Sequence, residues 1–262
     1  MKTSEGGTAI NERASSNTRE IVTCERLRQL KMSGMADAYE KQLNDPNADL
    51  TCFEERFAEI VEREWQIRYD KKFNRLLKLA RLRYPSADID ETINDPARKL
   101  DAASILKLSE CHWIDEGKNL IITGMTSSGK TYLSNALCVA ALRQMKTVRY
   151  VRANTLMLEL EQARLKTVYL EHVSALSKLD LLVIDDFGLM ELDLDKCRDL
   201  FEVIDGRDGR KSTIIVSQFP VKSWFDLFQE HTYADACLAR ITDKRHCYRL
   251  EMNGISMRDT DK

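Results

Sequence analysis

Residues 124–131 read GMTSSGKT and match the pattern G-x-x-x-x-G-K-[ST]. An apolar run, LIIT at 120–123, precedes them, and TYLSNALCVAALRQM at 131–145 follows with the spacing of an amphipathic helix. In such a turn, the backbone N–H groups of the loop and of the helix N-terminus face a phosphate chain. The stretch therefore predicts a nucleotide-binding loop between a strand and a helix. A chance match in a glycine-containing turn is the alternative, and the flanking strand and helix argue against it.

The residue types in this loop suit the binding of ATP and Mg²⁺. Gly124 and Gly129 allow backbone torsions that a side chain obstructs. We expect Lys130 to contact the β- and γ-phosphates and Thr131 to bring its hydroxyl to Mg²⁺. The other residues expected to bind the nucleotide are Met125, Thr126, Ser127, Ser128 and Tyr132.

Two later apolar runs end in polar residues that extend the expected site. LLVIDD delivers Asp185 to the carboxyl end of a buried strand, where ligands bind in open α/β sheets. We expect Asp185 to hold Mg²⁺, directly or through water, and Asp186 to polarise the attacking water. TIIVSQ ends in Ser217 and Gln218, either of which could reach the γ-phosphate. An ordinary polar strand end is the alternative for each run.

Alternating strands and helices after Asn119 predict an α/β fold with a parallel sheet, and one of these helices is expected at 154–178. Upstream, apolar residues recur at helical spacing, first in one helix at 24–45 and then in one long helix or two abutting ones that Pro85 stops. The expected organisation is a disordered tail at 1–23, a small all-α domain at 24–84, a polar linker at 85–100 and a nucleotide-binding domain at 101–262.

A basic stretch lies between Arg63 and Arg83. Its eight basic and two acidic residues give +6 over 21 residues, in a chain of net charge -2. Such a stretch is typical of a surface that follows nucleic-acid phosphates without reading sequence, and a solvated face on a core helix is the alternative. The candidate DNA-binding residues are Arg68, Lys71, Lys72, Arg75, Lys78, Arg81 and Arg83, with Arg164 and Lys166 as a weaker second group.

Composition excludes several other classes of site. The seven cysteines form no C-x-x-C pair, and the four histidines show no metal-ligand spacing, so neither a zinc site nor a disulfide framework is indicated. The first residues lack the apolar core of a signal peptide, and no apolar run approaches the roughly 18 residues of a membrane span. We therefore expect a cytoplasmic protein with no membrane partner.

Several stretches together resemble one family. They are, in chain order, MADAYEKQL, FEERFAEIVEREW, LARLRYP, GMTSSGKT, LDLLVIDDFG, STIIVSQFP, Trp224, ADACLARI and GISMR. In this order they are similar to the IstB-type transposition helper ATPases of insertion sequences, over roughly residues 24–258. The nucleotide-binding motifs are shared with DnaC-type helicase loaders, and the upstream stretches favour the IstB type.

The resemblance implies that 101–262 is an AAA+ P-loop ATPase domain. It also implies a homo-oligomer with ATP at subunit interfaces, which assembles on duplex DNA, deforms it, and recruits or stimulates a partner transposase. Arg240 then matches the arginine that enters a neighbouring subunit's site, and Arg258 matches the second sensor within its own subunit. Gln218 or Ser217 matches the first sensor, and the helical segment at 154–178 matches the element that faces nucleic acid.

The chain departs from the family pattern at three positions. Met125 and Ser127 stand where the family has Pro and Gly, and Asp186 stands where most AAA+ proteins have Glu. A positive φ at Ser127 would cost about 1–2 kcal/mol, and the shorter Asp186 predicts slow hydrolysis. The alternatives left open are a helicase loader, a small-molecule P-loop kinase, and a nucleotide-binding interaction module with negligible turnover.

Overall fold

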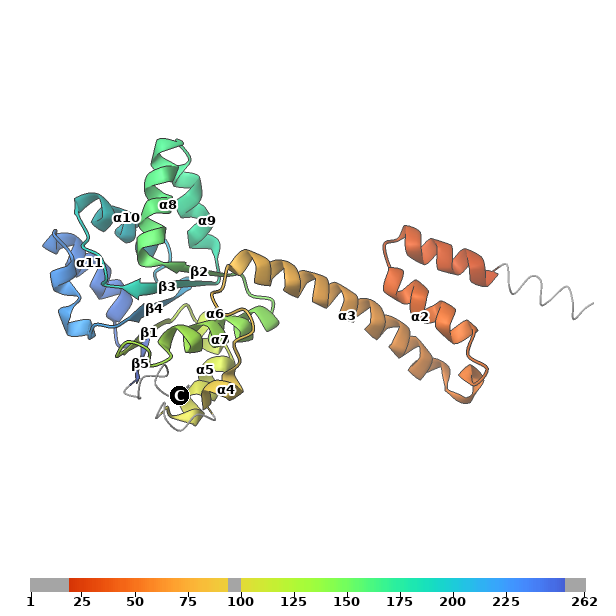
Figure 1. Ribbon diagram of the computed structural model, residues 1–262. Coiled ribbons are helices and arrows are strands. Elements are labelled where there is room, and N and C mark those ends of the chain that lie inside the picture. The colour runs from red at the N-terminus through yellow and green to blue at the C-terminus, as the bar shows by residue number, and fades with distance from the viewer. Residues whose placement is uncertain (1–18, 94–99, 253–262) are drawn as a thin grey trace, which may run out of the picture. The chain divides into compact units, whose positions relative to one another are not determined.

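The computed structural model describes residues 19–93 and 100–252 (Figure 1). The chain divides into two compact units, the first ending at Lys72 and the second beginning at Phe73. This division falls inside the long helix α3 (Phe53–Ala80). Among the helices of the described ranges, none combines the length and the apolar character needed to cross a membrane.

The first unit is helical. It contains a helix at 19–29, α2 (Ser33–Leu43), the short 3₁₀ helix η1 (Ala48–Leu50) and the first part of α3. The buried Glu64 of α3 accepts the backbone N–H groups of Gly34, at 2.8 Å, and Met35, at 3.3 Å, so it caps the start of α2. Sequence predicted one helix at 24–45, but the chain turns at residues 30–32, where Lys31 has φ +59°. Of the tail expected at 1–23, residues 1–18 lie outside the described residues, and 19–23 are helical.

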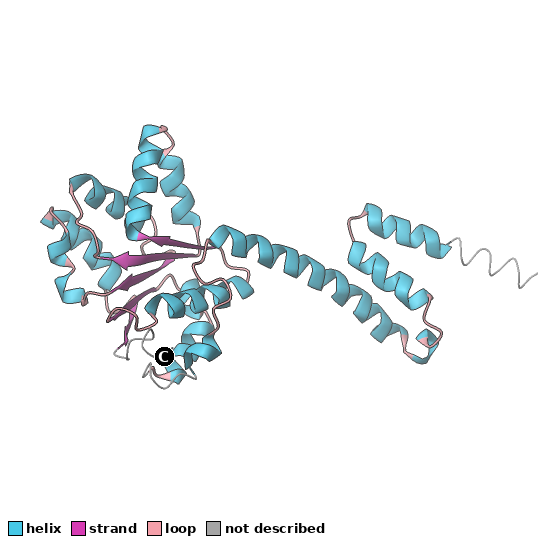
Figure 2. Cartoon of the chain, viewed as in Figure 1, coloured by secondary structure: helices cyan, strands magenta, loops and turns pink. Residues whose placement is uncertain are grey.

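The second unit is built on a five-stranded parallel sheet in the order β2-β3-β4-β1-β5 (Figure 2). Its strands are β1 (Asn119–Gly124), β2 (Val148–Arg152), β3 (Leu181–Phe187), β4 (Ser212–Ser217) and β5 (Cys247–Met252). The predicted α/β class, with a parallel sheet and a helical region before it, is confirmed. All five strands run the same way, so their carboxyl ends meet along one edge of the sheet.

Helices cover both faces of this sheet. They are α4 (Ile89–Ile93), α5 (Ala102–Ser109), α6 (His112–Asp115), α7 (Lys130–Arg143), α8 (Ala153–Leu165), α9 (Tyr169–Lys178), α10 (Leu194–Asp205) and α11 (His231–Thr242), with two 3₁₀ turns, η3 (Val221–Ser223) and η4 (Phe225–Leu227). Alternate strand residues enter two buried clusters, as expected for a sheet covered on both sides. Ile122 and Val183 pack with α5, α6 and α7 on one face, whereas Ile121 and Ile184 pack with α8 to α11 on the other.

Two sequence-based boundaries differ from this arrangement. The helix predicted at 154–178 is interrupted between α8 and α9, where Thr167 has φ +57°. The domain joint predicted at 85–100 is not where the compact units divide, because Leu76 and Ala80 at the end of α3 belong to the core of the second unit. Part of the expected linker forms α4, and residues 94–99 lie outside the described residues.

Candidate nucleotide-binding site

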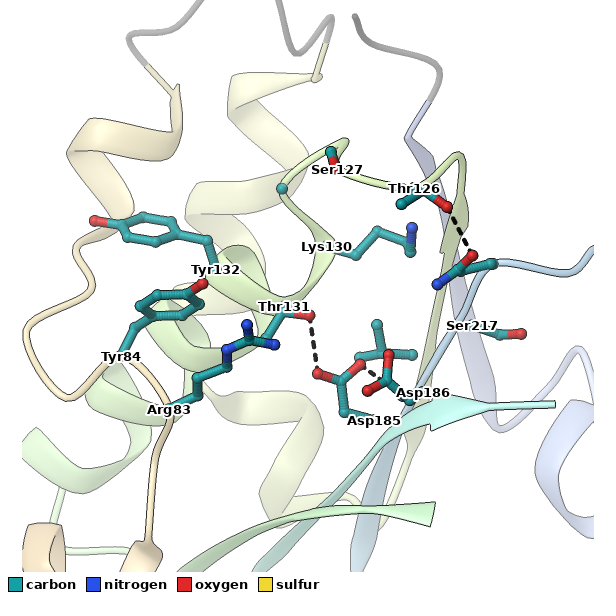
Figure 3. A pocket seen from close by; sticks show the side chains of 13 residues that line it. Arg83, Tyr84, Thr126, Ser127, Lys130, Thr131, Tyr132, Asp185, Asp186 and Ser217 are labelled. Atoms are coloured by element: carbon teal, nitrogen blue, oxygen red, sulfur yellow. Dashed lines mark hydrogen bonds between the residues drawn. The ribbon is translucent and has the colours of Figure 1, made fainter. Parts of the chain in front are cut away.

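A pocket of about 350 Å³ opens at the carboxyl ends of β1, β3 and β4, next to the start of α7 (Figure 3). This is the edge at which open parallel sheets bind their ligands. The lining residues are Arg83, Tyr84, Thr126, Ser127, Gly129, Lys130, Thr131, Tyr132, Asp185, Asp186, Val216, Ser217 and Gln218. The pocket thus brings together most of the predicted loop residues and both aspartates.

The loop backbone has the torsions that a phosphate cradle needs. Gly124 has φ +147°, and a Cβ there would lie 2.3 Å from the carbonyl oxygen of Met252. Gly129 has φ +88° and precedes α7, whose first N–H groups receive no side-chain cap. The Ser128 hydroxyl is buried and has no hydrogen-bond partner among the described residues. These open donors fit a phosphate chain, because helix N-termini and such loops bind anions through their N–H groups.

Ser127 has the left-handed backbone that its place in the motif requires, with φ +64°. A side chain in this region costs about 1–2 kcal/mol, which glycine avoids. The positive φ considered in the sequence analysis is therefore present at Ser127. The loop carries local strain that a glycine at this position would relieve.

The Lys130 side chain folds back onto the phosphate loop and binds two of its carbonyl groups. Its side-chain Nζ donates to the carbonyl oxygens of Gly124 at 2.7 Å and Met125 at 2.6 Å. An ammonium group has three donors, so one remains for a phosphate oxygen. Burial lowers the pKa of Lys130 from its ordinary value, and the nearby carboxylates of Asp185 and Asp186 oppose that change.

Asp185 is held in one orientation by three hydrogen bonds. Its Oδ2 accepts the hydroxyls of Thr131 at 2.8 Å and Tyr150 at 2.7 Å, and its Oδ1 accepts the Asp186 N–H at 2.7 Å. Burial raises the pKa of Tyr150, and the Asp185 carboxylate raises it further, so Tyr150 stays a neutral donor. A carboxylate and a hydroxyl side by side are the hard oxygen ligands that Mg²⁺ prefers.

No group of three or more His, Cys, Asp or Glu side chains within residues 19–93 and 100–252 is arranged to hold a metal. A metal at Thr131 and Asp185 would therefore need further ligands from phosphate or water. Mg²⁺ usually binds in this way, through one or two carboxylates and the phosphates of its nucleotide. The donor set accordingly fits Mg²⁺ that enters with a nucleotide.

Asp186 lies between carboxylate and cationic neighbours. It has φ +57°, and its Oδ2 is 3.5 Å from Nε of Arg152, which the pairing of β2 with β3 places opposite Asp185. Burial raises the pKa of Asp186 above its ordinary value, and the Asp185 carboxylate raises it further. Arg152, Arg83 and Lys130 oppose this change. A carboxyl with a raised pKa suits the transfer of a proton from water.

Of the two polar residues at the end of β4, Gln218 has its side chain at the loop. Thr126 donates its hydroxyl to Gln218 Oε1 at 2.7 Å. The Ser217 hydroxyl instead donates to the Phe187 carbonyl at 2.6 Å and accepts the Phe219 N–H at 3.1 Å. Gln218 is therefore better placed than Ser217 to present a polar group to a phosphate.

Arg240, the arginine expected to enter a neighbouring subunit's site, does not lie in this pocket. Arg240 lies on α11, where its guanidinium pairs with Asp205 at 2.7 Å and stacks 4.9 Å from the centre of the Phe201 ring. It does not line the pocket of its own chain. Arg258 lies outside the described residues.

The candidate DNA-binding residues fall into three groups. Arg68 pairs with Glu64 at 2.6 Å, Arg81 lies 3.6 Å from Glu159, and Arg164 pairs with Asp199. Arg83 lines the pocket. The exposed members without an ion-pair partner in the described part of the chain are Lys71, Lys72, Arg75, Lys78 and Lys166.

Sequence reasoning missed three residues at this site, Tyr84, Tyr150 and Arg152, and it did not foresee that Arg83 lines the pocket. A signal existed for Tyr150 and Arg152, because a strand paired with β3 must end beside Asp185. No local pattern indicated that Arg83 turns into the pocket.

The fold and the site together define a P-loop α/β domain built to bind a nucleotide. The structure resembles the crystal structure of the DnaC helicase loader with a TM-score of 0.54 and 19% identity, covering 65% of this chain and 99% of that chain. At this identity the likeness shows the fold.

The family is defined by the sequence. Residues 25–262 match the family described as IstB-like ATP binding protein. The chain is 35% identical over 236 residues to the insertion sequence ATP-binding protein y4pL of Sinorhizobium fredii, covering 90% of this chain and 95% of that protein. It is 38% identical over 198 residues to the ATP-binding protein of insertion sequence IS1162 from Pseudomonas fluorescens, covering 76% of this chain and 86% of that protein. The chain belongs to the IstB-like ATP-binding proteins of insertion sequences.

Proposed function

We propose that this protein is an ATP-dependent helper that assembles on duplex DNA, remodels it, and recruits or stimulates a partner transposase during insertion-sequence transposition. The observation that carries the proposal is the family match over residues 25–262, which includes the helical first unit as well as the pocket. The chain is thus related to insertion-sequence ATP-binding proteins along nearly all of its length, and not in the nucleotide-binding motifs alone.

The pocket supports slow ATP hydrolysis with Mg²⁺. When bound, Mg²⁺ would neutralise charge on the β- and γ-phosphates. Lys130 offers its third donor to the same phosphates, and Gln218 lies beside the loop to position the γ-phosphate or its water. Asp186 accepts the proton of the attacking water. Because Asp186 is one methylene shorter than Glu, we propose a low basal rate of hydrolysis. We also propose that DNA stimulates this rate.

The DNA-binding surface is proposed to be the exposed basic face of α3. Lys71, Arg75 and Lys78 are spaced by four and three residues, so they share one face of the helix, with Lys72 beside it. None of the four has an ion-pair partner within the described residues, so their charges are available to phosphates. Contacts of this type confer affinity without sequence preference.

The decisive experiment measures binding to a labelled duplex at moderate salt, with ATP and then with ADP. We expect tight binding with ATP, weaker binding with ADP, and loss of the ATP effect in Lys130→Ala. A second assay tests the proposed partner. It measures whether this protein stimulates DNA strand transfer by the transposase of the same insertion sequence. The proposal fails if neither nucleotide supports duplex binding.

A helicase loader is the second candidate, and the likeness to the DnaC structure favours it at the level of fold. A loader should prefer single-stranded DNA and capture a replicative helicase. The same binding assay with single-stranded competitor separates the two functions. A preference for the single strand, together with a co-purified helicase, would reverse the ranking.

A further inference from the structure

Arg83 is the last residue of the basic stretch and lies three residues beyond the end of α3, and its exposed side chain lines the nucleotide pocket. Arg81, with φ +52°, ends the helical path, and the chain then turns so that Arg83 and Tyr84 form a wall of the nucleotide pocket. Figure 3 shows the Arg83 side chain extending toward Thr131 and Asp185. This position suits a ligand in the pocket better than a DNA backbone outside it.

The pocket wall formed by Arg83 and Tyr84 is bonded to α7, the helix that follows the phosphate loop. The Tyr84 N–H donates to Oδ1 of the buried Asn135 on α7 at 3.1 Å, and Asn135 Nδ2 donates to the Thr131 carbonyl at 2.7 Å. The rings of Tyr84 and Tyr132 also meet, with centroids 5.7 Å apart. One amide side chain therefore links the wall to the residue expected to bind Mg²⁺, so Arg83 is positioned in advance.

The charges of the pocket also point to a phosphate ligand for Arg83. The charged lining residues are two cations, Lys130 and Arg83, and two carboxylates, Asp185 and Asp186. Two of the three Lys130 donors are used by loop carbonyls. The Arg83 guanidinium lies 5.5 Å from the centre of the Tyr84 ring. It acts on Asp186 through its charge but forms no ion pair with a carboxylate in residues 19–93 and 100–252. A planar guanidinium matches phosphate oxygens well, and the magnesium complex of ATP is still negative.

We propose that Arg83 binds the phosphate chain of ATP from within its own subunit, in addition to any arginine that a neighbouring subunit supplies. The inference rests on the proposed use of ATP at this site. Arg83 follows the end of α3 by a few residues, so its contact with the nucleotide would fix the segment through which α3 enters the second unit. The nucleotide is thereby connected to the helix that bears the basic face.

The test measures the affinity of a fluorescent ATP analogue with Mg²⁺ and without DNA, in an Arg240→Ala background that removes the expected arginine of a neighbour. We expect Arg83→Gln to weaken binding roughly tenfold or more, because a hydrogen bond to a charged group is lost. Arg83→Lys should bind better than Arg83→Gln. Arg81→Gln is the matched control, since Arg81 lies two residues away and faces Glu159, and it should bind like the background protein.

Lys130→Ala separates failure of this inference from failure of the proposed function. If Lys130→Ala binds as well as the background protein, ATP does not use the site and the proposed function falls. If Lys130→Ala loses binding while Arg83→Gln binds within twofold of the background protein, the assignment of Arg83 is overturned. Unchanged circular dichroism and thermal unfolding of Arg83→Gln, an exposed residue, show that a lost affinity is not a lost fold.

Discussion

At the scale of single residues, the proposed role of Asp186 as the base for hydrolysis can be tested by one substitution. Asp186→Asn keeps the shape of the side chain but removes the proton acceptor. We expect hydrolysis to fall by about 100-fold or more while ATP still binds, because general base catalysis contributes roughly that factor and the phosphate contacts come from other residues. Phosphate release and nucleotide titration measure the two effects. Equal loss of binding and hydrolysis would contradict the assigned role.

The raised pKa of Asp186 adds a pH dependence to the same prediction. As a base, Asp186 must be ionised, so kcat/KM should fall as pH drops through its raised pKa, above the range of an ordinary aspartate. For stability, the folded state holds this proton more tightly than the unfolded state. The contribution of Asp186 to stability therefore falls as pH rises from the ordinary to the raised pKa, and stays lower above it. Asp186→Asn should remove both effects, and an unchanged acid limb in that variant would exclude Asp186 as its source.

We infer that Tyr150 positions Asp185 for the proposed Mg²⁺ site. Its hydroxyl donates to Asp185 Oδ2 from a buried position on β2. Tyr150→Phe leaves that oxygen with Thr131 alone, so we expect the Mg²⁺ concentration for half-maximal activity to rise about tenfold, as happens when a metal ligand loses its supporting partner. We also expect the free energy of unfolding to fall by about 1–2 kcal/mol. A purely structural role would lower stability and leave the Mg²⁺ dependence unchanged.

At the scale of elements, the exposed basic face of α3 should set the salt dependence of DNA binding. Replacing Lys71, Lys72 and Arg75 by Ala should weaken duplex binding to all sequences alike. The slope of log affinity against log salt should become shallower by up to about 2.7, because each phosphate contact contributes about 0.9. The control removes the same charge elsewhere, at the exposed Lys107, Lys222 and Lys244. An equal loss in the control would mean that net charge, and not α3, governs binding.

Some helices and strands could be predicted from the sequence and others could not. The strand–loop–helix at Gly124 to Thr131 and the strand before Asp185 were predicted because apolar runs and glycine spacing are local patterns. The breaks at Lys31 and Thr167 were not, because a left-handed torsion at a non-glycine residue leaves no local mark. Neither break interrupts the apolar periodicity, so each pair of helices was predicted as one.

At the scale of the whole molecule, the least predictable feature was the division of the chain at 72 and 73. Pro85 and the polar residues after it indicated a linker, whereas Leu76 and Ala80 pack with residues of α5 and α7, far along the sequence. Contacts of that kind depend on the folded chain and not on neighbouring residues. The inward turn of Arg83 was missed for the same reason, because its partners lie on a loop and a strand more than forty residues away.

The last prediction concerns the assembly of several chains. Arg240 does not line its own pocket and pairs with Asp205 at 2.7 Å, so it must exchange that partner to reach the phosphate of a neighbouring subunit. A Lys130→Ala subunit offers Arg240 but cannot use ATP, and an Arg240→Ala subunit has the opposite defect. In an equal mixture, about one site in four then combines an intact pocket with a donated arginine, if the arginine acts between subunits. We expect about a quarter of the wild-type ATPase rate, whereas each variant alone is nearly inactive.

The control replaces the Lys130→Ala subunit by one that carries both Lys130→Ala and Arg240→Ala, which should restore nothing. Mixed assemblies that form, as shown by affinity tags on one variant, but remain inactive would show that Arg240 does not act between subunits.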